Sequence, residues 1–152
     1  MKNIIKLIVF LFVLFLSKHC FSHMYEVEGV EILHPWSTES DNDGNANTYL
    51  TIANNTDKDI SLTKISTEIS SMYMIMSNEK MVKKLIIPAQ SIRSIDDFYV
   101  MLHGINKKLN IGNAFPAKLI FSSGMKIDIK FVIGESTSLD EAEESMKHEH
   151  HH

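Results

Sequence analysis

Apolar and polar side chains alternate along much of the chain between Val27 and Ile133, and this period of two constrains the fold more than any other feature. Because successive side chains of a β-strand point to opposite faces, such alternation predicts strands with one buried face. The last run shows it most clearly, with apolar residues at Ile127, Ile129, Phe131 and Ile133. No segment of this region has the 3.6-residue period of an amphipathic helix. The pattern therefore predicts an antiparallel β-sandwich or barrel.

Turn-forming residues divide this region into short strands. The expected strands are Val27–Ile32, Thr48–Ala53, Ile60–Ile65, Met72–Met76, Met81–Ile87, Ser91–Ile95, Tyr99–His103, Ala117–Phe121 and Lys126–Ile133. The segment Asp41 to Asn45 is expected to be a loop. A length of about 130 residues after the N-terminal segment suits one domain, which we place at residues 23–134.

Residues 1–22 have the pattern of a cleaved secretory signal peptide. Lys2 and Lys6 precede ten apolar residues, and Cys20 and Ser22 stand at the −3 and −1 positions of a cut before His23. An uncleaved membrane anchor is disfavoured because the apolar run is short for a span of about 20 residues. A lipoprotein acylated on Cys20 is the other alternative, although the residues before Cys20 are not small. The expected location is periplasmic.

Cleavage would remove the only cysteine, so thiolate metal sites and disulfides within the mature chain are excluded. It would also lower the count of Lys and Arg from 15 to 12 against 19 Asp and Glu, which gives a net charge of −7. A negative domain does not favour nucleic acid or anionic lipid as a partner.

Four of the nine methionines fall between residues 72 and 81, at Met72, Met74, Met76 and Met81. On a strand, Met72, Met74 and Met76 would share one face. Thioether sulfur is a soft ligand that suits Cu(I) and binds Mg²⁺, Ca²⁺ or Zn²⁺ poorly. The expected strand Tyr99–His103 adds Met101 and His103 on one face.

A packing role is the alternative for the three alternating methionines, because methionine is a flexible core filler. Similarly, a lone histidine is usually a surface or hydrogen-bonded residue. A histidine close to several methionines is a better metal ligand, since imidazole also binds copper.

Both ends of the mature chain carry further histidines. The acidic segment 135–152 has one large aliphatic residue and is expected to be a flexible tail. It ends in His148, His150, His151 and His152, which could collect metal or be an expression tag. If cleavage leaves His23 at the N-terminus, its amine and imidazole could chelate Cu(II), with Met24 beside them.

The stretch from about Val30 to Ile133 resembles the periplasmic copper(I) chaperones of the PCuAC family. The resemblance is carried by Val30–Ser37, Asn47–Asn54, Ile86-Ile87-Pro88-Ala89, Val100–Ile105 and Ile111–Phe121. It implies a cupredoxin-like Greek-key sandwich and a Cu(I) site made of two His and two Met.

The ligand positions of that family are altered in this chain. Its first His falls at Met72 and its second at Tyr99, whereas its methionines fall at Met81 and Met101. His103 lies two residues beyond Met101 and could replace the lost imidazole. The expected ligands are therefore Met72, Met81, Met101 and His103, with Met74 and Met76 as weaker candidates. The resemblance also implies delivery of copper to an oxidase subunit or assembly factor.

A structural or interaction domain that has lost the metal site is the alternative function. An enzyme is not expected, because the sequence has no convincing Ser/His/Asp set, no paired carboxylates in a recognisable frame and no glycine-rich phosphate loop.

The histidine-rich C-terminus should prefer divalent ions and lose them in acid, because imidazoles protonate near a pKa of about 6.5. Deleting Lys147 to His152 should remove the Ni²⁺ and Cu²⁺ binding that fades as histidine protonates, and should leave Cu(I) binding by the domain in place. Calorimetric titration of both forms checks this. Loss of Cu(I) binding on deletion would instead make the tail the only metal site.

Overall fold

The computed structural model describes residues 24–134, and these residues form strands joined by turns and loops. The strands are β1 Met24–Val27, β2 Val30–Ser37, β3 Ala46–Asn54, β4 Ile60–Ser66, β5 Met72–Ser77, β6 Lys80–Val82, β7 Leu85–Ile87, β8 Ser91–Arg93, β9 Phe98–His103, β10 Ala114–Phe121 and β11 Lys126–Ile133. The predicted signal peptide and the predicted tail lie outside these residues. Within residues 24–134, no helix is long and apolar enough to cross a membrane.

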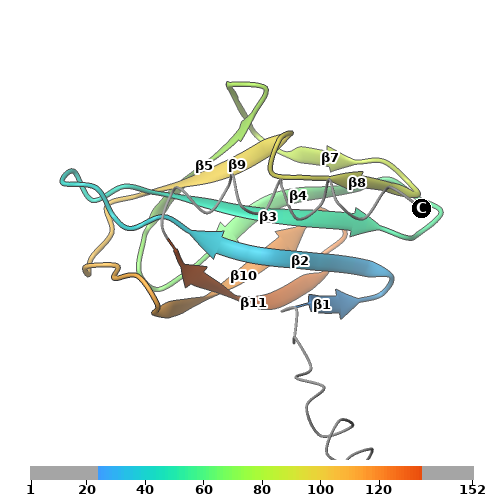
Figure 1. Cartoon of the computed structure of the whole chain (residues 1–152). Coiled ribbons are helices and arrows are strands. Elements are labelled where there is room, and N and C mark those ends of the chain that lie inside the picture. Colours follow the sequence, from blue (N-terminus) through green and yellow to red (C-terminus); the bar gives the residue numbers. More distant parts are fainter. Residues whose placement is uncertain (1–23, 135–152) are drawn as a thin grey trace, which may run out of the picture.

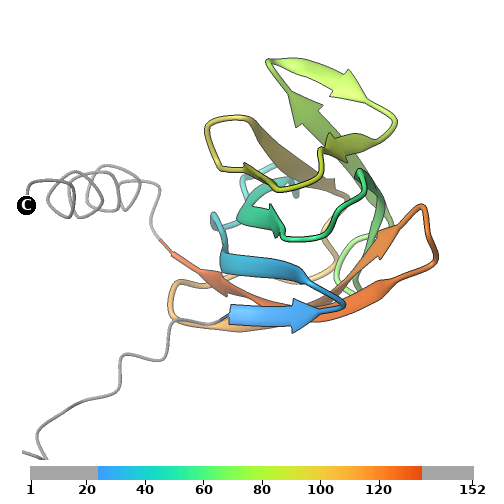
Figure 2. The same cartoon turned by 90° about the vertical axis from the view of Figure 1, so that its right-hand side faces the viewer.

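The strands form one sheet that folds over on itself into a sandwich (Figures 1 and 2). Its order is β6-β5-β9-β3-β2-β11-β10-β4-β7, with β1 added to β2 and β8 added to β3. The predicted all-β sandwich is confirmed. One junction departs from the antiparallel pattern, because β11 runs parallel to β2 and pairs Val132 with Trp36. This junction joins β11, the last strand in the sequence, to β2, the first long strand in the sequence. The alternation of side chains within single strands does not reveal such a contact.

Two hairpins turn on only two residues each, at Glu28-Gly29 and Asn78-Glu79. All four residues have positive φ, which is the backbone of a type I′ turn. The first turn separates β1 from β2, so the prediction of one strand over Val27–Ile32 was wrong. The second turn places Met76 directly opposite Met81.

The predicted strand Met81–Ile87 is also two strands, β6 and β7. The two pair at opposite ends of the sheet order, β6 with β5 and β7 with β4. The exposed residues Lys83 and Lys84 make the crossing between them. Figure 1 shows the β5–β6 hairpin projecting beyond the body of the sandwich.

The core lies between the two layers and is made of aliphatic and phenylalanine side chains. Its largest fully buried members are Phe98, Phe115, Phe121, Phe131, Ile32, Leu50, Ile52, Leu62, Ile75, Ile87, Leu102 and Leu109. Ile75 is 2% exposed, whereas Met72 on the same strand is 61% exposed. The methionines of β5 therefore do not belong to the core, and the packing alternative for them is not supported.

Adjacent isoleucines on β7 test this division between core and surface. Ile87 is fully buried and Ile86 is 45% exposed. Ile87→Ala should lower the free energy of unfolding by about 2–5 kcal/mol, because it leaves a cavity in the core. Ile86→Ala should lower it by much less. Urea denaturation measures both, and equal losses would contradict the assigned faces.

Candidate metal centre

The pairing of β5 with β9 brings the soft side chains together. Met72 lies directly opposite His103, and Met74 lies opposite Met101. All four alternate with core residues such as Ile75 and therefore point to the solvent side of the sheet. We call the solvent side of β6, β5, β9, β3 and β2 the outer face.

Met72, Met74, Met101 and His103 form a compact group, which we call the Met–His block. Directly opposed residues of an antiparallel pair have Cβ atoms about 5 Å apart, and diagonal neighbours are about 7–8 Å apart. Met72, Met74 and His103 also line a surface hollow of about 540 Å³, together with Ser71 and Tyr73. Three methionines and one histidine thus lie on neighbouring positions of the outer face, and three of these four residues line the hollow.

Met76 and Met81 lie farther along the same face. Met76 is opposite both Met81 on β6 and Tyr99 on β9. Met81 is therefore four residues from the Met72–His103 pair along the strand direction, about 14 Å, and two strands across from His103. The structure does not bring Met81 together with His103, because the tight turn at Asn78-Glu79 fixes its register.

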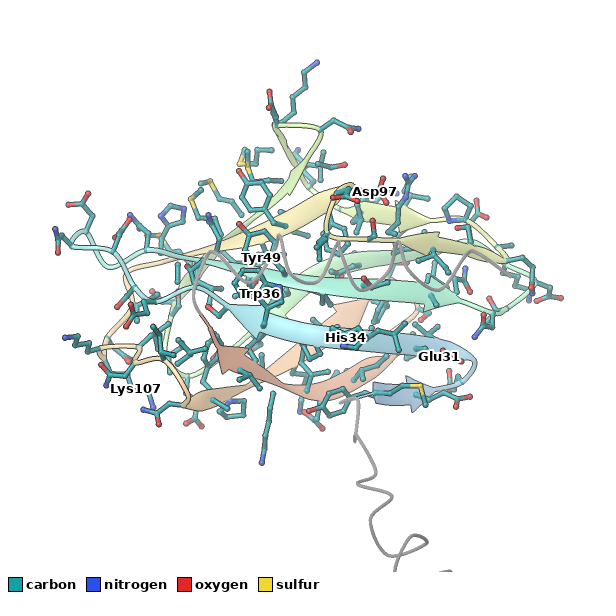
Figure 3. All side chains as sticks on the ribbon, in the orientation of Figure 1. Glu31, His34, Trp36, Tyr49, Asp97 and Lys107 are labelled. Atoms are coloured by element: carbon teal, nitrogen blue, oxygen red, sulfur yellow. The ribbon has the colours of Figure 1, made fainter. Side chains whose placement is uncertain are left out.

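Tyr99 belongs to an aromatic row that continues across β3 and β2. Its ring centroid lies 5.9 Å from that of Tyr49, which stacks on Trp36 at 4.5 Å. Figure 3 shows Trp36 and Tyr49 side by side on neighbouring strands. Burial raises the pKa of Tyr49 above its ordinary value of 10.0. A row of neutral phenol and indole rings offers packing surface and no soft ligand.

His103 is held in place by the loop that precedes β3. Its Nδ1 lies 2.7 Å from Oδ1 of Asn45, and Nδ2 of Asn45 donates to Asp41 Oδ2 at 3.2 Å. The backbone amides of Asp43 and Asn45 donate to the other carboxylate oxygen of Asp41, at 2.9 and 2.8 Å. The backbone carbonyl of His103 accepts a hydrogen bond from the Ser70 hydroxyl.

The remaining ring nitrogen of His103, Nε2, is buried and has no hydrogen-bond partner. An unsatisfied buried polar atom costs about 1–3 kcal/mol, so native structures rarely keep one without a reason. A metal ion that accepts this lone pair would satisfy the atom. The donor set fits Cu(I), because the neighbouring ligands are thioethers. Among residues 24–134, no group of three or more His, Cys, Asp or Glu could hold a harder ion.

Asp41 and Asn45 are the residues of this centre that sequence reasoning missed. They were expected only to form a loop, and Asn45 contacts a residue 58 positions away. The available signal was the Asp-x-Asp-Gly-Asn composition, in which Asp caps backbone amides two to four residues on.

The other predicted ligands are placed as follows. His23, His148, His150, His151 and His152 lie outside the described residues. Met24 lies on β1, is 54% exposed and pairs with Leu33, so it is not part of the Met–His block. His34, the remaining histidine of residues 24–134, lies inside β2 at a register shift and has a positive φ of 47°.

A cupredoxin-like sandwich that carries methionine and histidine on one outer face is the class of protein defined by this fold and site. The family model described as "Putative lipoprotein LpqE-like" matches residues 30–133. The chain belongs to this LpqE-like family. No curated protein matches the chain.

Solved PCuAC domains have the same fold. The copper-bound PCuAC domain from PmoF2 matches with a TM-score of 0.69 at 20% identity, over 74% of this chain and 98% of that domain. The apo PCuAC domain from PmoF1 matches with a TM-score of 0.69 at 24% identity, over 74% and 99%. The solution structure of Cu(I)-DR1885 from Deinococcus radiodurans has a TM-score of 0.56 at 23% identity, over 67% and 77%. The predicted PCuAC resemblance and cupredoxin-like fold are confirmed.

The loop hydrogen bonds should respond to acid through Asp41. Its pKa lies below the ordinary value of 3.8, mainly because the backbone amide of Asn45 donates to the carboxylate. A lowered pKa means that the fold favours the ionised form, so the loop contacts persist at neutral pH and are lost as the pH falls through the folded-state pKa. The amide NMR signals of Asp43 and Asn45 should therefore titrate together, below pH 3.8.

Asp41→Asn is the control, because it removes the titrating group and should abolish this transition at both amides. Persistence of the transition in that variant would assign it to another carboxyl group.

Proposed function

We propose that this protein is an exported carrier that binds one Cu(I) ion at the Met–His block. The observation that carries the proposal is the buried, unpartnered Nε2 of His103, a residue that shares its sheet face with three methionines on the paired strands β5 and β9. Methionines that only filled the core would not lie opposite a histidine with a buried, unpartnered nitrogen. An exposed surface histidine would hydrogen-bond to water through both ring nitrogens.

The ligand chemistry favours Cu(I) over the divalent competitors. Thioethers are neutral and soft, so a set of three thioethers and one neutral imidazole matches a soft monovalent ion. Zn²⁺ would gain little from this set, because its protein sites are built from thiolate, imidazole and carboxylate ligands. The absence of any carboxylate from the Met–His block also disfavours Ca²⁺ and Mg²⁺.

The position of the block suits transfer of a metal to a partner. Met72 is 61% exposed, whereas Met74, Met101 and His103 are partly buried. A receiving protein could therefore reach Met72 first and exchange ligands from that side. Strand ends and loop borders are common places for such exposed functional residues.

The comparisons support the copper part of this proposal. Two of the matched structures are a copper-bound PCuAC domain and a Cu(I)-loaded protein. Delivery to the assembly of a cytochrome oxidase rests on the resemblance to PCuAC chaperones alone. The role proposed here is that of a carrier, not an enzyme.

The family description supports export, because lipoproteins are exported. It also strengthens the alternative in which the protein is a lipoprotein acylated on Cys20. The other form is the predicted one, cleaved before His23. Both forms would place the copper site outside the cytoplasm, and the periplasm is the compartment that we propose.

The second candidate function is an interaction domain without metal. Exposed methionines form adaptable binding surfaces, and Met72 and Met81 are 61% and 66% exposed. The aromatic row of Trp36, Tyr49 and Tyr99 would extend such a surface across the same face.

Substitution of one partly buried ligand, Met101, distinguishes the copper carrier from the interaction domain. Met101→Leu keeps the side-chain volume and should cost less than about 1.5 kcal/mol of stability. It removes a thioether from the block, and we expect Cu(I) affinity to fall about tenfold or more, as for loss of one ligand interaction of about 1.4 kcal/mol. Competition with a Cu(I) chelator under reducing conditions measures this in the chain truncated after Met146.

Met125→Leu is the matched control, because Met125 packs against the core immediately before β11 and lies outside the block. It should bind Cu(I) as the parent does. Unchanged binding by Met101→Leu would favour the interaction domain.

A further inference from the structure

The loop that joins β2 to β3 ends beside the imidazole of His103, and its contacts determine which nitrogen of that ring carries the proton. Asp41, as a carboxylate, can only accept hydrogen bonds. Its contact with Asn45 Nδ2 therefore fixes the orientation of the Asn45 amide, with Nδ2 toward Asp41 and Oδ1 toward His103. The reversed amide would set two oxygen acceptors against each other.

The Asn45 oxygen in turn fixes the tautomer of His103. An amide oxygen cannot donate, so the 2.7 Å contact with Nδ1 requires a proton on Nδ1. In the neutral ring Nε2 then keeps its lone pair, and this is the nitrogen that is buried without a partner. A histidine side chain in water favours the opposite tautomer, with the proton on Nε2, so the contact with Asn45 imposes the Nδ1–H form.

The loop itself is anchored to the end of β9. The amide of Ile105, two residues after His103, donates to the carbonyl of Gly44 at 2.9 Å. Gly44 has a positive φ of 75°, a backbone that favours glycine. The side chain of Asn45 is thus tied to the strand that carries His103 as well as to Asp41.

We propose that Asp41 and Asn45 are positioning residues for a metal ion, acting through His103. They hold the ring as the Nδ1–H tautomer and present Nε2 as its one ligand atom. This inference rests on the proposed function, since the ion concerned is the Cu(I) of the Met–His block. Partners of this kind orient metal-binding histidines in many proteins, and their loss typically weakens metal binding by about 10- to 100-fold.

The tautomer can be read in the metal-free protein, so positioning is tested apart from copper binding. In the ¹⁵N-labelled full chain, two-bond ¹H–¹⁵N correlation spectra above the titration range of histidine should show His103 with its proton on Nδ1. In Asn45→Ala the ring should shift toward the Nε2–H form. In Asp41→Ala, which frees the Asn45 amide to rotate, the shift should be partial.

Cu(I) affinity is measured on the same proteins by chelator competition. It should fall about 10- to 100-fold in Asn45→Ala and less in Asp41→Ala. Asn42→Ala is the matched control, because Asn42 is an exposed residue of the same loop. It should change neither the tautomer nor the affinity. If Asn45→Ala did not fold, the shift and the affinity loss in Asp41→Ala would still support the proposal.

A parent protein with the proton on Nε2 would overturn the proposal, and so would an unchanged tautomer in both variants. A changed tautomer with unchanged Cu(I) affinity would also overturn it. Failure of the parent to bind Cu(I) is a different result, because it refutes the copper site while the spectra still show whether the pair sets the tautomer.

Discussion

The register between β5 and β9 is the constraint on which the rest of the outer face depends. It pairs Met72 with His103 and Met74 with Met101. A shift of β5 by one residue would turn its methionines inward and expose Ile75, which packs in the core together with Val100 of β9. The free energy of burying these core residues therefore fixes the arrangement of the soft side chains on the opposite face. The packing of the core and the grouping of the candidate ligands are therefore both consequences of the β5–β9 register.

The two kinds of side chain in the Met–His block are held differently. Methionine has three rotatable bonds and can adjust its sulfur position as an ion arrives or leaves. His103 is fixed by Asn45 at Nδ1, and the hydroxyl of Ser70 holds its backbone carbonyl. A fixed imidazole with mobile thioethers around it suits a carrier, because binding needs one well-placed ligand and release needs ligands that can move.

Much of the fold was predictable from alternation, because a strand with one buried face repeats every two residues. Lys126–Ile133 is a strand over the range that its pattern predicted. Two features were not predictable in this way. The turn at Glu28-Gly29 divides a run that alternates loosely, and the crossing at Lys83-Lys84 divides a run that was expected to be one strand. The turn makes β1 and β2 a local hairpin, whereas the crossing depends on partners elsewhere in the sheet, β5 for β6 and β4 for β7.

The candidate site was predicted in part for the same reason. Alternation places Met101 and His103 on one face, and the structure agrees. Met81 was predicted as a ligand from the family's ligand positions, but the hairpin turn places Met81 beside Met76. The roles of Asp41 and Asn45 arise from a loop that closes over 58 residues of chain, and local sequence patterns carry no information on such a contact.

The most direct test of the account is a Cu(I) titration of the chain labelled with ¹³C at its methionine methyl groups. The first equivalent of Cu(I), added under reducing conditions, should shift the methyl signals of Met72, Met74 and Met101 and leave that of Met125 unchanged. A response confined to Met76 and Met81 would place the ion at the hairpin. No methionine response at all would show that the Met–His block does not bind copper.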